Sequence, residues 1–243
     1  MRSVASALIT ALVLAVSPAA RGQDFSPMAD FATARGMAAS QGAATTDVLR
    51  HTLGGISRSA SRKPGSKSAV AAPAVINRLE YLSTPATMQA ALSAYLARAR
   101  RADPAAADAA GRMLVGRDIS RIYRTVVGPF GLRDRNVADA YAAYVVLGWM
   151  IANDGADPSP AAVRAVRDQL AVRVVTDPSL ARYSPAALGE EFKLSFVILH
   201  SGWQSARRDG DIRQFADGVA QLFGRQGLDL RSVRLTPVGL VSR

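Results

Sequence analysis

The chain has 243 residues, no cysteine, 49% apolar residues and a formal net charge of +11. This length predicts one or two domains, and the apolar fraction is sufficient for a hydrophobic core. The lack of cysteine excludes disulfides, thiol nucleophiles, iron–sulfur clusters and cysteine-ligated zinc. Of the 30 basic residues only Lys63, Lys67 and Lys193 are lysines, so 27 are arginines. Such a bias, in a chain rich in alanine, is typical of a GC-rich genome and weakens the charge as evidence for an anionic partner.

The first 22 residues have the pattern of a secretory signal peptide. A basic residue precedes an apolar run, residues 4–16, and the small residues Ala20 and Gly22 stand at positions −3 and −1 of a cleavage site. The run is shorter than the roughly 20 apolar residues of a membrane-spanning helix. No cysteine follows it for lipid attachment. We therefore expect a periplasmic or secreted bacterial protein that is cleaved near Gly22, with no transmembrane segment in the mature chain.

The next segment, residues 23–79, has low-complexity composition. Residues 54–73 contain three glycines, two prolines and five serines, and the stretch from Val48 to Arg78 has six basic residues and no acidic one. Such composition favours an extended, solvated chain. We expect residues 23–79 to form a largely disordered basic tether, and the alternative is a basic arm that contacts an anionic surface.

From residue 80 onward, apolar residues recur at helical spacing between capping residues and prolines. These signals predict about six helices, the second running from Pro104 to Val126. The third, residues 138–152, is apolar on nearly every side and is expected to be a buried central helix with a close neighbour at Gly148. Residues 80–243 are therefore expected to form an all-α bundle of about six helices with an extended C-terminal tail, residues 227–243.

Several short runs in this domain resemble an uncharacterised family of exported bacterial helical domains of unknown function. They are residues 135–141 with Trp149, residues 158–160 with 165–167, and residues 227–231. The resemblance covers about residues 80–243. It implies a helical fold and an exported location, and it carries no catalytic residue.

The sequence holds few groups for catalysis. His51 falls in the expected tether, and His200 falls in the middle of a predicted helix, where a half-buried structural role is expected. There is no Gly-x-Ser-x-Gly, Ser-x-x-Lys or His-Glu-x-x-His motif and no glycine-rich phosphate loop. We therefore expect no metal site and no cofactor.

Two pairs of carboxylates offer an alternative. Asp154 and Asp157 share a predicted loop, and Glu190 and Glu191 stand near the start of a predicted helix. Paired acids about 5–10 Å apart can hydrolyse glycosides. Roles in turns and at the helix N-terminus are the simpler explanation for these residues. A hydrolase would require at least two of the four in one pocket.

Arginines give the best candidate for a binding site. Arg117, Arg121 and Arg124 are spaced to share one face of the second helix, and Arg98 and Arg101 form a pair on the first. Residues 81–135 hold nine basic and four acidic residues, against twelve and eleven in residues 136–243. These five arginines are the predicted anion-binding residues. Nucleic acid is not expected as a partner, because the protein is predicted to be exported and no exposed aromatics interleave the arginines.

The preferred interpretation is an exported, non-enzymatic envelope or secreted protein that binds an anionic envelope component or another protein. The alternative is a hydrolase that acts on a cell-envelope glycan with paired carboxylates.

Overall fold

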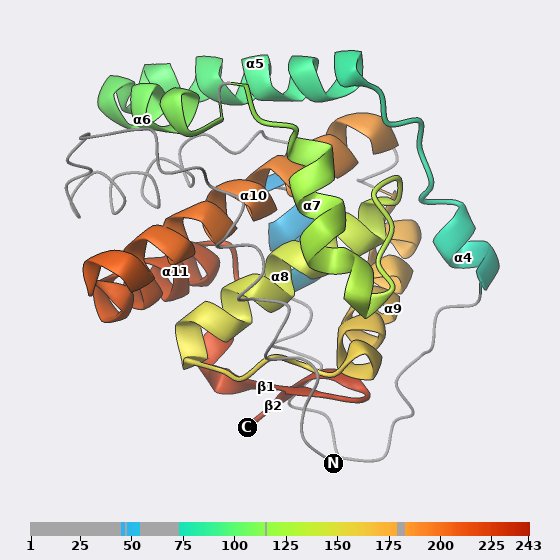
Figure 1. Cartoon of the computed structure of the whole chain (residues 1–243). Helices are drawn as coiled ribbons and strands as arrows, with labels where there is room; N and C mark the ends of the chain where they lie inside the picture. The colour runs from blue at the N-terminus through green and yellow to red at the C-terminus, as the bar shows by residue number, and fades with distance from the viewer. Residues whose placement is uncertain (1–44, 47, 54–72, 115, 179–182) are drawn as a thin grey trace.

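The structure is a computed structural model that describes residues 45, 46, 48–53, 73–114, 116–178 and 183–243. The predicted signal peptide lies outside these residues, as does most of the predicted tether. The described residues are 75% helical with one small sheet, which confirms the all-α class (Figure 1). No helix in the described residues combines the length and apolar character that crossing a bilayer requires.

The helices follow one another closely along the chain. They are α4 (Pro73–Asn77), α5 (Pro85–Ala102), α6 (Pro104–Leu114), α7 (Ile119–Val127), η1 (Gly128–Phe130), α8 (Val137–Asn153), α9 (Pro160–Thr176), α10 (Pro185–Asp209), α11 (Ile212–Arg225) and η3 (Leu230–Ser232). At four of the helix starts a side chain accepts hydrogen bonds from backbone N–H groups of the first turn. The capping residues are Thr84, Asn136, Ser159 and Ser184.

Helix α8 is the centre of the fold, as its sequence predicts. Every residue in it except Trp149 and Asn153 is buried, and α9, α10 and α11 pack around it (Figure 1). The ring of Tyr144 stacks on Phe223 of α11 at 4.8 Å between centroids. A Cβ at Gly148 would lie 2.5 Å from the same phenylalanine ring. The expected close contact at Gly148 is therefore confirmed.

The predicted second helix is divided into two. Gly116 adopts a left-handed conformation with φ of 70°, and Asp118 caps the new helix α7 by accepting from the backbone N–H of Arg121. Gly116 follows the end of α6 and Asp118 starts α7, so the chain changes direction between the two helices. Helices α5 and α6 form a hairpin along one edge of the molecule (Figure 1), and the hairpin contacts the body through α5 and α10.

The helical part of the chain begins before residue 80. Residues 48–53 form a short helix in which Val48, Leu49 and Leu53 are completely buried in the same core cluster as α8. The low-complexity composition of the surrounding segment hid this Val-Leu-x-x-x-Leu pattern, which has helical spacing. Helix α4 also belongs to the body, since the side-chain amide of Asn136 donates to the carbonyl oxygen of Ile76 at 2.7 Å.

The predicted extended tail is a β-hairpin that follows η3. Strands β1 (Val233–Thr236) and β2 (Gly239–Ser242) pair antiparallel, with Leu235 opposite Leu240. The hairpin is held by α9, where the side-chain amide of Gln169 makes two 3.0 Å bonds to the backbone N–H and carbonyl of Leu240. The indole N–H of Trp149 donates to the carbonyl of Val233 at 3.0 Å. The side chains of Gln169 and Trp149 thus bind the backbone of the hairpin to the bundle.

Candidate anion-binding surface

Helix α7 is strongly amphipathic and presents its arginines to solvent. Ile119, Tyr123 and Val127 lie on its buried face, and Arg121 and Arg124 lie on its exposed face. The sequence spacing of three and four residues produces this division directly. Arg117 is also exposed, in the turn that precedes α7 rather than in the helix.

The five predicted arginines do not form one group. Arg117, Arg121 and Arg124 lie together at α7. Arg101 is exposed in the last turn of α5, and the whole of α6 separates it in the chain from α7. Arg98 points inward instead, and its guanidinium is 3.0 Å from a carboxylate oxygen of Glu191 with 22% of its side chain exposed. The structure therefore removes Arg98 from the surface that the sequence predicted.

Two further arginines in the loop after α7 differ in role. Arg133 donates from its backbone N–H and from Nε to Asp139 at 3.1 and 3.0 Å, and it also pairs with Glu80. Asp139 is completely buried, and burial raises the pKa of its carboxyl group while the bonds from Arg133 oppose that rise. Arg133 is thus a structural partner. Arg135 is exposed, at 3.9 Å from Asp134.

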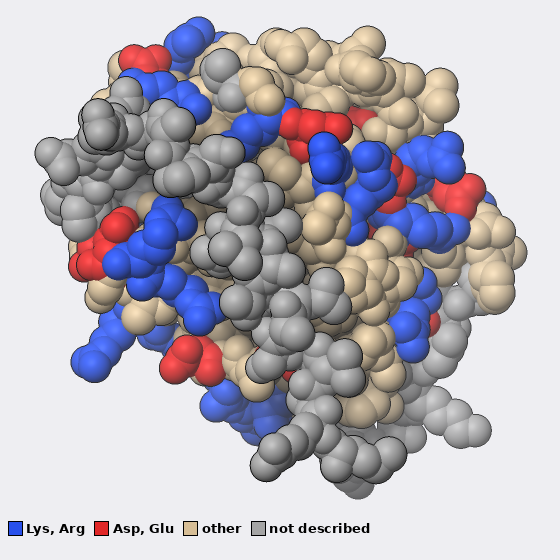
Figure 2. Space-filling model, in the orientation of Figure 1, with Lys and Arg blue, Asp and Glu red and all other residues tan. Residues whose placement is uncertain are grey.

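We define the α7 arginine surface as Arg117, Arg121, Arg124 and Arg135. Figure 2 shows basic side chains gathered over α7 and the loop that follows it, with acidic side chains among them. Asp134 in the loop after α7 accepts from Arg124 at 2.9 Å. Residues 117–135 hold five arginines and two aspartates, so the segment carries a formal charge of +3 (5 − 2). The surface is therefore partly neutralised, and Arg117 and Arg121 make no ion pair within the described residues.

The carboxylates near the start of α10 are structural. Glu190 is completely buried, and one of its oxygens lies 2.7 Å from the ammonium of Lys193, which is also completely buried. Its other oxygen accepts from the hydroxyl of Thr87 at 3.0 Å, and Lys193 also donates to the hydroxyl of Ser83 at 2.9 Å. Glu191 is the partner of Arg98. The two adjacent glutamates thus hold α5 against α10.

Asp154 and Asp157 lie elsewhere, in the exposed loop that follows α8. Asp154 ends α8 in a left-handed conformation with φ of 47°, a role in which aspartate is favoured. Figure 1 places this loop away from the start of α10. The four candidate carboxylates therefore do not converge.

The two histidines also have structural surroundings. The ring nitrogen Nδ1 of His51 lies 3.0 Å from the carboxylate of Asp177, the C-cap of α9. His200 stacks on Phe196 and meets the edge of Trp203, and burial lowers its pKa to about 4. In the part of the chain that the structure describes, no three acidic or histidine side chains are grouped as metal ligands.

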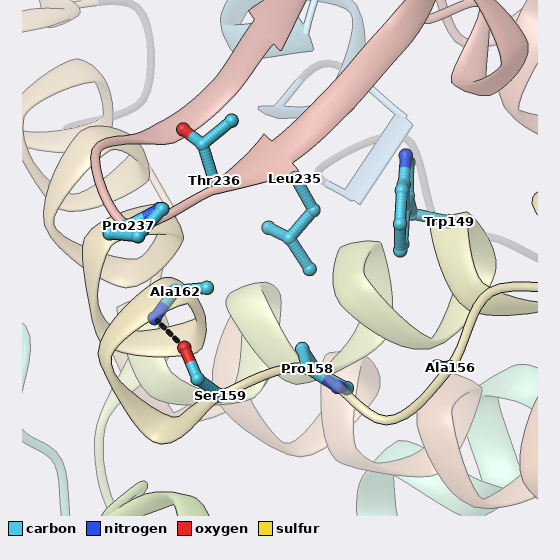
Figure 3. A pocket seen from close by; sticks show the side chains of 8 residues that line it. All are labelled: Trp149, Ala156, Pro158, Ser159, Ala162, Leu235, Thr236 and Pro237. Carbon is cyan, nitrogen blue, oxygen red and sulfur yellow. Dashed lines mark hydrogen bonds between the residues drawn. The ribbon is translucent and has the colours of Figure 1, made fainter.

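A small hollow lies between the β-hairpin and the loop before α9 (Figure 3), with a volume of about 260 Å³. Trp149, Leu235 and two prolines are among the eight residues that line it, and none of the eight is charged. The hydroxyl of Ser159 accepts from the backbone of Ala162, and that of Thr236 donates to the carbonyl of Gly239. The lining therefore holds no group placed for acid–base or nucleophilic chemistry.

Sequence reasoning missed the roles of Lys193 and Asp139. Lys193 is the single charge in the run Phe192–Leu199, and Glu190 precedes it by one helical turn. A lone lysine within a buried apolar stretch, with an acid at i−3, was the available signal for a buried ion pair.

In comparisons with known proteins, no protein-family model, curated protein or solved structure matches the chain.

Proposed function

We propose that this protein is an exported, non-enzymatic bacterial protein that binds an anionic component of the cell envelope through the α7 arginine surface. The observation that carries the proposal is the exposed position of Arg117 and Arg121 beside Arg124 and Arg135. The signal-peptide pattern of residues 1–22 supports export. The resemblance of residues 80–243 to exported helical domains of unknown function is also in favour of export.

Arginine suits this task because its planar guanidinium forms paired hydrogen bonds with phosphate and carboxylate groups. Several such groups on one surface act together on a ligand that carries repeated negative charges. Because the arginines are exposed, their attraction for the ligand is screened by salt. A phosphate-rich glycolipid such as lipopolysaccharide fits this chemistry.

The binding test is retention of the mature protein on immobilised lipopolysaccharide, eluted with a salt gradient. Replacing Arg117 and Arg121 together by alanine should move elution to clearly lower salt, since two of the four cations are lost. The matched control replaces Arg213 and Arg225, two exposed arginines of α11, and changes the net charge equally. The control should elute close to the unmodified protein.

An equal shift for both double variants would show that only the net charge matters, and retention that is independent of salt would exclude the arginine surface. Binding of the unmodified protein to an acidic protein but not to lipopolysaccharide would exclude a glycolipid ligand. Export is tested separately: the mass of the protein recovered from the periplasm or medium should correspond to a chain that begins at Gln23.

A further inference from the structure

Residues 48–53 form a short helix, here called the docked helix, that is embedded in the body of the protein. It is seen in blue at the centre of Figure 1, behind α8. Val48, Leu49 and Leu53 have no exposed surface, and Thr52 has 1%. Arg50 and His51 are on the opposite, exposed side. The inward residues stand at i, i+1, i+4 and i+5, which is one face of an α-helix.

Polar groups of α8 and α9 hold the docked helix at defined points. The hydroxyl oxygen of Thr52 is 2.5 Å from the carbonyl oxygen of Val48 and 2.5 Å from the hydroxyl oxygen of Tyr141. Thr52 has one hydroxyl proton, which the carbonyl must receive, so Tyr141 donates to Thr52. The ring of Tyr141 is fixed by stacking on Phe192 at 4.5 Å.

A second anchor contacts residues 51 and 52 of the docked helix. Arg173 of α9 donates to the carbonyl oxygen of Thr52 at 3.2 Å, and Asp177 contacts His51 at 3.0 Å. Arg173 thus bonds to the backbone of the segment, and Asp177 contacts a side chain on its exposed side. The site therefore contacts both the apolar face and the backbone of a short helical segment.

The docked helix is attached to the rest of the fold through the 19 residues 54–72. One end of this connection is the docked helix, which is bonded to Tyr141 of α8 and Arg173 of α9. The other end is α4, which also packs on α9. The docked helix thus contacts the body as a ligand would. A short helix whose apolar face is laid against a receiving surface is a recurrent mode of peptide recognition.

We propose that the surface of α8 and α9 beneath the docked helix is a peptide-binding groove, and that residues 48–53 of a second copy of the chain can occupy it. Tyr141, Arg173 and Asp177 are its polar specificity groups. In the intact chain the attached segment has the advantage of a high local concentration, which favours occupation from within the same molecule. Cutting the connection removes that advantage and makes exchange between molecules measurable.

The test uses the mature protein with a short protease recognition sequence inserted after Gly65. After cleavage, the N-terminal fragment should remain bound in gel filtration, because its side chains stay buried. A fluorescent peptide of residues 45–53 should then replace it and saturate at one peptide per protein. The peptide with Leu49→Asp should bind at least about tenfold more weakly, whereas Arg50→Ala, on the exposed side, should bind as the parent peptide does.

Three results would overturn the proposal. Loss of the fragment after cleavage with an unchanged circular dichroism spectrum would show that the segment has no affinity of its own. Unfolding of the body after cleavage would show that the segment is an integral part of the core rather than a ligand. Failure of the labelled peptide to enter over days, with the fragment still bound, would show that the site does not exchange.

Discussion

Gly148 and Gly111 are both inside helices, but their surroundings are opposite. A Cβ at Gly148 would meet the buried ring of Phe223, whereas a Cβ at Gly111 in α6 would have nothing within 4 Å. Gly148→Ala should therefore lower the free energy of unfolding by about 1–3 kcal/mol through overpacking. Gly111→Ala should raise it by up to about 1 kcal/mol through helix propensity. Urea titrations of the two variants test this, and a Gly148→Ala protein as stable as the parent would contradict it.

His200 makes stability depend on pH in a defined window. Its pKa is about 4 in the folded protein and about 6.5 when unfolded, so the unfolded chain binds more protons between these values. The free energy of unfolding should therefore fall as the pH is lowered from about 6.5 to 4, by up to about 3 kcal/mol, with no contribution from this residue above that window. The His200→Gln variant should lack this fall in the free energy of unfolding between pH 6.5 and 4. Urea midpoints measured from pH 4 to 8 would show parallel curves for the two proteins if the prediction is wrong.

At the scale of elements, the buried pair of Glu190 and Lys193 joins α10 to the start of α5 through Thr87 and Ser83. Lys193→Met alone should cost about 3–5 kcal/mol of unfolding free energy, since it leaves a buried carboxylate without its counter-charge. The double variant Glu190→Met/Lys193→Met should cost clearly less than the sum of the two single variants.

The single and double variants of Glu190 and Lys193 form a double-mutant cycle. Its control is the exposed pair of Arg100 and Asp108, which are 3.9 Å apart with 65% and 60% of their side chains exposed. Alanine replacements there should show a coupling energy of about 0.5 kcal/mol or less. Equal coupling energies in the two cycles would mean that burial does not govern the Glu190–Lys193 pair.

The elements were predictable where the signal was local. Serine, threonine or asparagine caps, most of them followed by proline, mark the helix starts, and the apolar sequence of α8 marks its burial. The break at Gly116 was missed because apolar periodicity continues on both sides of it. Arg98 was misplaced for a different reason: its partner Glu191 is far away in the sequence, and spacing along one helix cannot show which arginine a distant carboxylate will bind.

At the scale of the whole molecule, one hydrophobic cluster extends from Val48 through α8 to Leu240. A single core predicts a single cooperative transition for the described body. Trp149 reports on the contact of α8 with the β-hairpin, and Trp203 reports on the second half of α10. Two variants keep one tryptophan each: Trp203→Phe keeps Trp149, and Trp149→Phe keeps Trp203. In each variant, the urea midpoint measured by tryptophan fluorescence should equal the midpoint measured by circular dichroism. Different midpoints would indicate two independent units.

The burial of Lys193 has a practical consequence for chemical labelling. It is the single lysine among the described residues, and its side chain has no exposed surface. Reagents that acylate amines should therefore leave the folded body unmodified, and bifunctional amine cross-linkers should fail to record its contacts. The rate of acylation at Lys193, measured by mass spectrometry, would instead report how often α5 separates from α10.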